Sequence, residues 1–161
     1  ITYADDMGSF ISIATFVSDI PSEEFTWREV KSMDICGSCH ICLDNCPTGA
    51  ILQDRFLIDN ERCLTKYNEW GTDDFPEWIP KSAHHHLTGC LKCQIKCPMN
   101  KKRVDSISET VAFSEEETAM ILAGIGKEDM PKGLADKIDR CCLNWYLKSL
   151  PRNLKAMFAN A

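Results

Sequence analysis

The apolar positions of this chain form one long run near its beginning and several short helical patterns near its end. Residues 8–20 have the sequence GSFISIATFVSDI, which is rich in β-branched and aromatic residues and has no breaker before Pro21. Both alternating faces of this run are largely apolar, as is typical of a strand covered on both sides. Since a lone strand is not stable in water, we expect it to pair with a sheet encoded upstream of Ile1, or with a short local partner such as residues 56–58.

Three helices are predicted in the last third of the chain. Residues 114–117 form a capping box, and the helix that follows is expected to end at Gly124. A second helix is predicted to begin near Pro131 and to run to Leu147. A third is predicted after Pro151, because proline suits the first turn of a helix.

The middle of the chain has little periodicity of either kind. Residues 36–103 hold eight of the ten cysteines and four of the seven prolines. A segment of this length without regular patterning is not typical of a packed core. We therefore expect something other than hydrophobic burial to hold it together.

Composition and charge exclude several classes of protein. No apolar run reaches the roughly 18–20 residues of a membrane span. The net charge of −6 argues against a broad phosphate-binding surface, so nucleic acid is not an expected partner. No secretory leader is visible, and the chain begins with Ile1 rather than Met, so we expect a cytoplasmic protein with a part missing upstream.

The cysteine spacing carries the strongest chemical signal. The first motif is C-x2-C-x2-C-x3-C-P, from Cys36 to Pro47, and it matches the iron–sulfur run of bacterial ferredoxins. In that run three thiolates hold one cluster, and the fourth serves the other cluster of a two-cluster protein. A partial copy, C-x2-C-x3-C-P, lies 51 residues downstream, from Cys90 to Pro98.

The copy lacks one ligand, because the counterpart of Cys36 is Leu87. Cys63 is the candidate replacement, placed on a short turn that begins at Asp59. Eight thiolates then serve two [4Fe-4S] clusters. Cluster 1 is predicted to be held by Cys36, Cys39, Cys42 and Cys97. Cluster 2 is predicted to be held by Cys46, Cys63, Cys90 and Cys93.

Other interpretations of the cysteines fit less well. Disulfides suit a secreted chain, but the C-x2-C-x2-C spacing is poor geometry for such bridges. A zinc ribbon uses two C-x2-C pairs, yet it leaves the third cysteine and the two Cys-Pro steps unexplained. The run His84–His86 is expected to be a polar loop rather than a ligand set, and Cys141 and Cys142 are expected to be structural.

The motifs CGSCHICLDNCPTGAI, DNERC and GCLKCQIKCPMNKK together resemble the double [4Fe-4S] cluster domain of the epoxyqueuosine reductase family, whose broad plan reductive dehalogenases share. The resemblance implies that Cys63 is a ligand of cluster 2 and that one cluster lies near a cobalamin. It also implies that Thr65 lies near this corrinoid, and that residues 8–20 are the last strand of an upstream corrinoid module.

From these observations we predict an α+β fold of the two-cluster ferredoxin type, made mostly of loops and short helices. Residues 1–30 are the expected strand and connector, 31–103 the cluster domain, and 104–161 a helical tail. The predicted function is electron transfer within a larger oxidoreductase, with cobalamin only in the intact protein. The expected partner is an upstream corrinoid module or a redox protein. The alternative is a structural iron–sulfur module that binds a protein or a nucleic acid.

Overall fold

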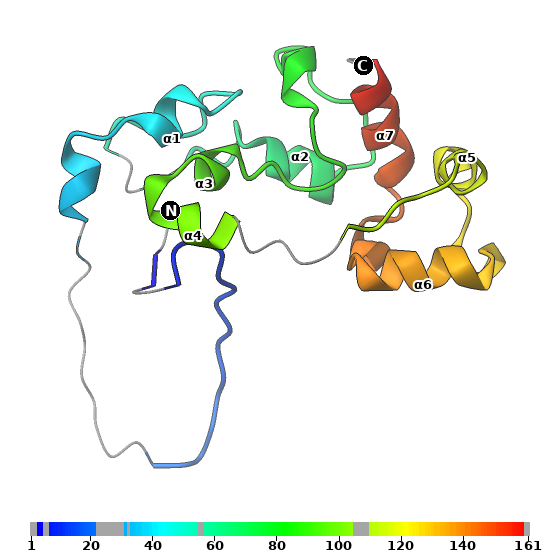
Figure 1. Cartoon of the computed structure of the whole chain (residues 1–161), viewed down its shortest axis with the longest axis horizontal. Helices are drawn as coiled ribbons and strands as arrows, with labels where there is room; N and C mark the ends of the chain where they lie inside the picture. The colour runs from blue at the N-terminus through cyan, green and yellow to red at the C-terminus, as the bar shows by residue number, and fades with distance from the viewer. Residues whose placement is uncertain are drawn as a thin grey trace.

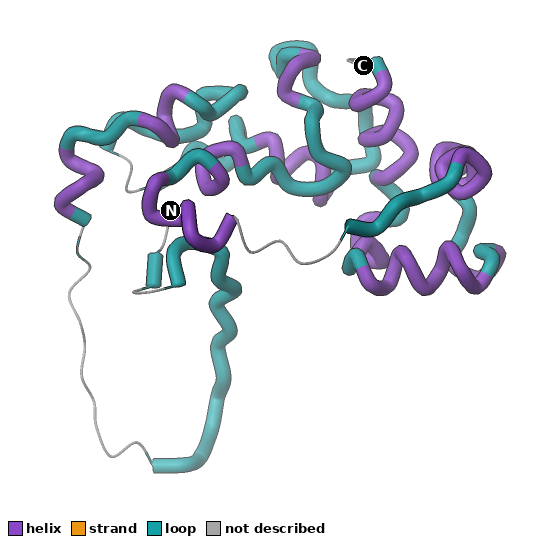
Figure 2. The backbone as a smooth tube through the Cα atoms, in the orientation of Figure 1, coloured by secondary structure: helices purple, strands orange, loops and turns teal. Residues whose placement is uncertain are grey.

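A computed structural model describes residues 3–4, 7–21, 31, 33–54, 57–104 and 110–159 of the chain. Within these ranges the regular structure is helical, and Figure 2 shows no strand in them. The α-helices are α1 (Ile41–Asp44), α2 (Leu64–Trp70), α3 (Lys92–Ile95), α4 (Lys101–Val104), α5 (Glu115–Ala123), α6 (Lys132–Arg140) and α7 (Leu150–Phe158). Short 3-10 helices span Asp34–Gly37, Lys81–Ala83, Pro98–Asn100, Lys127–Asp129 and Leu143–Tyr146.

The predicted α+β fold and its N-terminal strand are wrong. Residues 10–19 form an irregular segment that projects from the rest of the molecule (Figure 1). Phe16 is 87% exposed and Val17 fully exposed, so neither apolar face has a cover in the described part of the chain. Without a neighbouring strand the backbone has no ladder of hydrogen bonds to join, and β propensity alone does not produce a strand.

The pairing of the apolar run with residues 56–58 is also wrong for residues 57 and 58, which the structure describes. Ile58 forms an isolated antiparallel bridge with Ile51, and Asp59 N donates to the carbonyl oxygen of Ala50 at 2.8 Å. Residue 56 lies outside the described residues. The same is true of residues 22–30 and 105–109, so the domain boundaries expected near residues 30 and 103 stay predictions.

The C-terminal helices follow the sequence signals closely. The Ser114 side chain accepts from Glu117 N, and the Glu117 carboxylate accepts from Ser114 N, which is the predicted capping box. Helix α5 ends at Gly124 in the left-handed conformation, and Pro151 lies in the first turn of α7. Helix α6 is shorter than predicted, because Cys142 adopts a left-handed φ of 53° and the chain continues as a 3-10 turn.

Two small apolar cores stabilise the described structure. The larger lies among α5, α6 and α7 and consists of Ile121, Leu134, Ile138, Leu143 and Leu150. The smaller lies beside α2 and consists of Leu64, Ile79, Ala83 and Cys90. The smaller core lies wholly within the cysteine-rich segment 36–103, which therefore has some hydrophobic packing of its own.

Buried amides join α7 to α2. The Asn153 side chain donates to the carbonyl oxygens of Asn68 at 2.7 Å and of Leu87 at 2.8 Å. The Ser149 hydroxyl donates to the same Asn68 carbonyl at 3.2 Å, and Arg152 donates to Tyr67 O at 2.6 Å. The bonds to Tyr67 O and Asn68 O satisfy backbone acceptors at the end of the short helix α2, where intrahelical donors run out.

The Asn68 side chain fixes the loop that leads to Cys90. Its Nδ2 donates to the carbonyl oxygen of Gly89 at 2.6 Å, and Gly89 N donates back to Oδ1 at 3.1 Å. Gly89 has a φ of +65°, a conformation that favours glycine. The backbone just before Cys90 is therefore held by one buried amide.

In the part of the chain that the structure describes, no helix has both the length and the apolar character needed to cross a membrane.

We expect Asn68→Ala to lower the free energy of unfolding by on the order of 2–3 kcal/mol, because it leaves both backbone groups of Gly89 buried without partners. Chemical denaturation of anaerobically prepared protein measures this change. The matched control is Gln53→Ala, which removes an exposed amide and should change stability by less than about 0.5 kcal/mol. Equal stability of the two variants would contradict the role given to Asn68.

Candidate iron–sulfur centre

Four of the eight cysteines proposed as ligands line a single cavity of about 880 Å³. They come from three separate parts of the chain: the turn after α1, the residue before α2, and the entry to α3. The four are Cys46, Cys63, Cys90 and Cys93. The cavity is much larger than a single metal ion requires, and most of its other lining is apolar.

The Cys46 sulfur lies in a turn that directs backbone amides toward it. Ala50 N donates to Cys46 Sγ at 3.1 Å, and the Thr48 hydroxyl lies 3.7 Å from the same sulfur. Burial alone would raise the pKa of the Cys46 thiol, but amides of Thr48, Ala50 and Ile51 outweigh burial and lower this pKa. This sulfur is therefore prepared to be a thiolate, the form that binds iron.

Cys63 is placed by the turn predicted from Asp59. Glu61 N donates to Asp59 Oδ1 at 3.0 Å, and Cys63 N donates to Asn60 O at 3.2 Å. The Arg62 guanidinium donates to Thr48 O at 2.9 Å, which ties this turn to the Cys46 turn. One arginine thus keeps two cysteines, 17 positions apart in the sequence, on the same cavity.

Cys90 and Cys93 lie on either side of a left-handed residue. Leu91 has a φ of 56° and precedes α3, so the chain reverses between the two thiols. Burial raises the pKa of Cys90, and it raises the pKa of Cys93 to about 11. The nearby sulfurs of Cys46 and Cys63 add to both shifts through charge repulsion.

The donor set fits an iron–sulfur cluster chemically. Four thiolates in this partly dry cavity would repel one another, so ionising all four thiols requires a positive partner between them. Thiolates are the ligands that iron–sulfur clusters use, and the amides beside Cys46 match the hydrogen bonds that such sulfurs accept.

Three of the other four cysteines lie within or just before α1, and the fourth, Cys97, directly precedes the 3-10 helix Pro98–Asn100. Cys36 lies in the 3-10 helix Asp34–Gly37, Cys39 precedes α1, and Cys42 lies in α1. Helices α1 and α3 are neighbours, and Cys97 follows α3. Among the described residues, no three Cys, His, Asp or Glu side chains are grouped as a ready site for a single metal ion.

Tyr3 contacts this second group of cysteines and was not predicted from the sequence. Its hydroxyl donates to Cys97 Sγ at 2.9 Å. Burial raises the pKa of the Tyr3 phenol, and the bond to Cys97 and the charges of Cys36 and Cys42 raise it further. Cys36, Cys42 and Cys97 are therefore all close enough to Tyr3 to affect it. No sequence signal marked this contact, because 94 positions separate its two residues.

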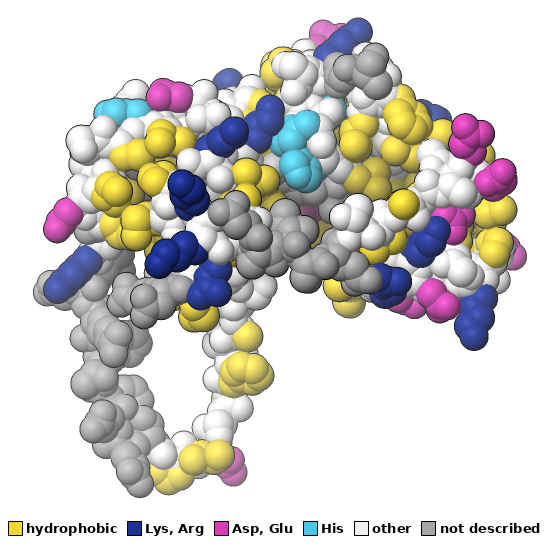
Figure 3. All heavy atoms as spheres, viewed as in Figure 1, with side chains coloured by type: hydrophobic (Ala, Val, Ile, Leu, Met, Phe, Trp, Pro, Cys, Tyr) yellow, Lys and Arg dark blue, Asp and Glu magenta, His cyan; other side chains and the backbone are white. Residues whose placement is uncertain are grey.

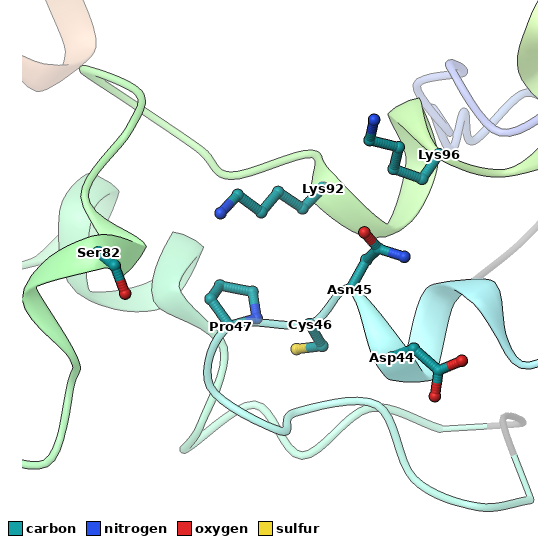
Figure 4. A pocket seen from close by; sticks show the side chains of 7 residues that line it. All are labelled: Asp44, Asn45, Cys46, Pro47, Ser82, Lys92 and Lys96. Carbon is teal, nitrogen blue, oxygen red and sulfur yellow. The ribbon is translucent and has the colours of Figure 1, made fainter.

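Two lysines from α3 border the Cys46 turn. Lys92 and Lys96 line a second cavity, of about 460 Å³, together with Asp44 and Pro47. Figure 4 shows the Lys92 side chain extending from α3 toward Pro47, whereas the end of Lys96 is directed away. Lys92 thus places positive charge beside the thiols and helps to oppose the rise in the pKa of Cys90.

The other residues singled out in the sequence are Thr65 and the run His84–His86, and they lie in different parts of the structure. Thr65, the predicted corrinoid neighbour, is half-buried in the lining of the 880 Å³ cavity, near the exposed Trp70. His85 hydrogen-bonds Cys90 O at 3.1 Å, and its Nε2 is 3.9 Å from Cys90 Sγ. His84 packs against Phe75 with ring centroids 4.3 Å apart, so the histidine run supports the loop before Cys90.

Comparison with known proteins finds matches for the segment that carries the eight cysteines. Residues 35–100 match the model of the 4Fe-4S double cluster binding domain. Over 98 residues, 60% of this chain, the sequence is 36% identical to the epoxyqueuosine reductase of Atelocyanobacterium thalassa, covering 28% of that protein. It is also 36% identical over 97 residues to the epoxyqueuosine reductase of Bacillus subtilis, covering 23% of it.

A third relative, described as an uncharacterized protein in the gldA 3' region of Geobacillus stearothermophilus, is 35% identical over 97 residues, or 42% of its length. The chain thus spans less than half of each of these curated relatives. No solved structure matches it. Residues 35–100 therefore match a 4Fe-4S double cluster binding domain, and this part of the chain is similar to part of the epoxyqueuosine reductases.

Proposed function

We propose that this chain is an electron-transfer module with two [4Fe-4S] clusters that works within a larger reductase. The observation that carries the proposal is the convergence of Cys46, Cys63, Cys90 and Cys93 on one cavity. These thiols come from both copies of the cysteine motif and from the turn between them, as a two-cluster arrangement requires.

The proposed ligand sets are those of the sequence motif. Cluster 1 takes Cys36, Cys39, Cys42 and Cys97, and cluster 2 takes Cys46, Cys63, Cys90 and Cys93. Each bound cluster supplies a centre that accepts and returns one electron. The chain's own part is to hold the thiolates apart, to donate amides to Cys46, and to place Lys92 beside the excess negative charge.

The cavity of cluster 2 has an apolar extension that suits a larger partner group. Leu57, Thr65 and Trp70 line the same cavity as the four thiols, and Trp70 is 83% exposed. We propose that in the intact protein a corrinoid faces this side, with Thr65 beside it, and receives electrons from cluster 2. The similarity to epoxyqueuosine reductases supports this arrangement.

The projecting segment is the proposed contact with an upstream module. Residues 10–20 expose Ile13, Phe16, Val17 and Ile20, more apolar surface than a solvated loop normally carries. In this proposal an upstream corrinoid module covers that apolar surface. The proposed setting of the whole protein is the cytoplasm, where thiols stay reduced.

A redox protein is the other proposed partner, and the face of this chain that is proposed to bind it is basic. Lys96, Lys101, Lys102 and Arg103 are exposed near Cys97, although the whole chain carries a charge of −6. Figure 3 shows Lys and Arg side chains gathered over α3 and α4. Such a face favours an acidic electron donor through electrostatic steering. The same face favours the alternative function, a structural cluster module that binds an acidic partner.

We expect anaerobic reconstitution to give about eight iron and eight sulfide per chain, as two [4Fe-4S] clusters require. Elemental analysis and sulfide assay measure both. Zinc in place of iron, or iron without sulfide, would overturn the proposal.

Cys63→Ala should reduce the iron content from about eight to about four per chain, because cluster 2 loses one of its four ligands. The matched control is Cys141→Ala, which removes a half-buried thiol outside the proposed ligand sets and should leave the iron content unchanged. Retention of all eight irons by the Cys63 variant would refute this ligand assignment.

Electron transfer also requires that the clusters change oxidation state reversibly. We expect dithionite to bleach the visible absorption and air-free reoxidation to restore it over repeated cycles. Absorption that does not respond to the reductant, with full iron content, would favour the structural alternative instead.

A further inference from the structure

We propose that Tyr3 tunes cluster 1 by donating a hydrogen bond to the thiolate of Cys97 and thereby raising the reduction potential of that cluster. The inference rests on the proposed function, since it takes Cys97 as a ligand of cluster 1. It goes beyond that function by assigning a role to a residue outside the cysteine motifs.

The contact has the geometry of a functional hydrogen bond. Tyr3 Oη is 2.9 Å from Cys97 Sγ, a short distance for a bond to sulfur, and the pair is partly buried. A phenol is a donor at neutral pH. Because the cluster gains one negative charge on reduction, a donor to its thiolate stabilises the reduced state more than the oxidised one.

A clip of short-range bonds holds Tyr3 in this position. The clip consists of residues 3–4 and 7–9. Ala4 and Gly8 form an antiparallel bridge, with Ala4 N donating to Gly8 O and Gly8 N donating to Ala4 O, both at 3.0 Å. Ser9 directly follows this bridge and lies six positions after Tyr3 in the sequence.

Asn100 fastens the clip to the segment that carries Cys97. Ser9 N donates to Asn100 Oδ1 at 2.9 Å, and Asn100 Nδ2 donates to Ser9 Oγ at 2.7 Å and to Gln94 O at 2.8 Å. Asn100 is fully buried, three positions after Cys97 in the 3-10 helix.

Gly8 is required by the same contact. A Cβ atom at Gly8 would come within 2.3 Å of Asn100 Oδ1, and its φ of +74° strains any other residue. The clip and the ligand segment are therefore fitted to each other, which is more than a loose terminal contact needs.

The test compares Tyr3→Phe with the unchanged chain by redox titration of the iron-loaded protein, followed by electron paramagnetic resonance of each reduced cluster. The variant keeps the ring and loses only the hydroxyl. At a fixed ambient potential, we expect the ratio of oxidised to reduced cluster 1 to rise about three- to tenfold, where tenfold corresponds to about 59 mV for one electron. Cluster 2 should not change.

Two further variants test whether the shift in reduction potential belongs to cluster 1 and arises from Tyr3. In the Cys63→Ala background only cluster 1 is expected to remain, so Tyr3→Phe should shift the single remaining potential. The matched control is Tyr146→Phe, in a half-buried tyrosine of the C-terminal 3-10 helix, and it should shift neither potential.

Each result has one meaning. Unchanged potentials, equal shifts of both clusters, or loss of iron from Tyr3→Phe would overturn the tuning role. If the unchanged chain holds two reducible clusters while Tyr3→Phe has no effect, this inference fails and the proposed function stands. An unchanged chain without reducible clusters overturns both.

Discussion

Repulsion among thiolates in a partly dry cavity is the constraint on which the middle of this molecule depends. Burial raises the pKa of Cys90 and raises that of Cys93 to about 11, and the charges of Cys46 and Cys63 add to both shifts. The apolar residues buried nearby are few and include Ala50, Ile51 and Leu64, which line the same cavity. Four thiolates can be kept in this cavity only with a cationic centre shared among them, as in small metal-binding domains generally.

The surrounding chain reduces this repulsion in several ways. Amides of the turn after Cys46 donate to its sulfur, Arg62 joins that turn to the Cys63 turn, and Lys92 adds a positive charge. Farther out, Asn68 fixes the loop before Cys90 and is itself held by Asn153 of α7. The C-terminal helices thus support the ligand loops through buried amides, although they carry none of the proposed ligands.

Sequence reasoning succeeded where a signal is local. The capping box at Ser114, the stop at Gly124 and the proline of α7 act within a few residues, and each helix follows them. The cysteine spacing is local in the same sense, and the family match at residues 35–100 confirms the double-cluster interpretation. The left-handed conformation of Cys142 has no comparable marker in the sequence. For this reason the early end of α6 was not predicted.

The features that were not predicted from the sequence depend on contacts between residues far apart in the chain. The apolar run at residues 10–20 has the composition of a strand, but strand formation depends on a partner that the described residues do not provide. Tyr3 has no pattern around it that indicates a sulfur ligand 94 positions away. The support that Asn153 gives to Asn68 is likewise invisible until α7 and α2 are placed side by side.

The clip gives the projecting segment a fixed origin. Ser9 is bonded to the ligand-bearing part of the chain, and Phe16 follows it by only seven positions, at most roughly 25 Å of extended backbone. A molecule that binds these apolar side chains is therefore held within a short length of chain from Cys97. Its distance from the first centre is limited by chain length before any surface of its own makes contact.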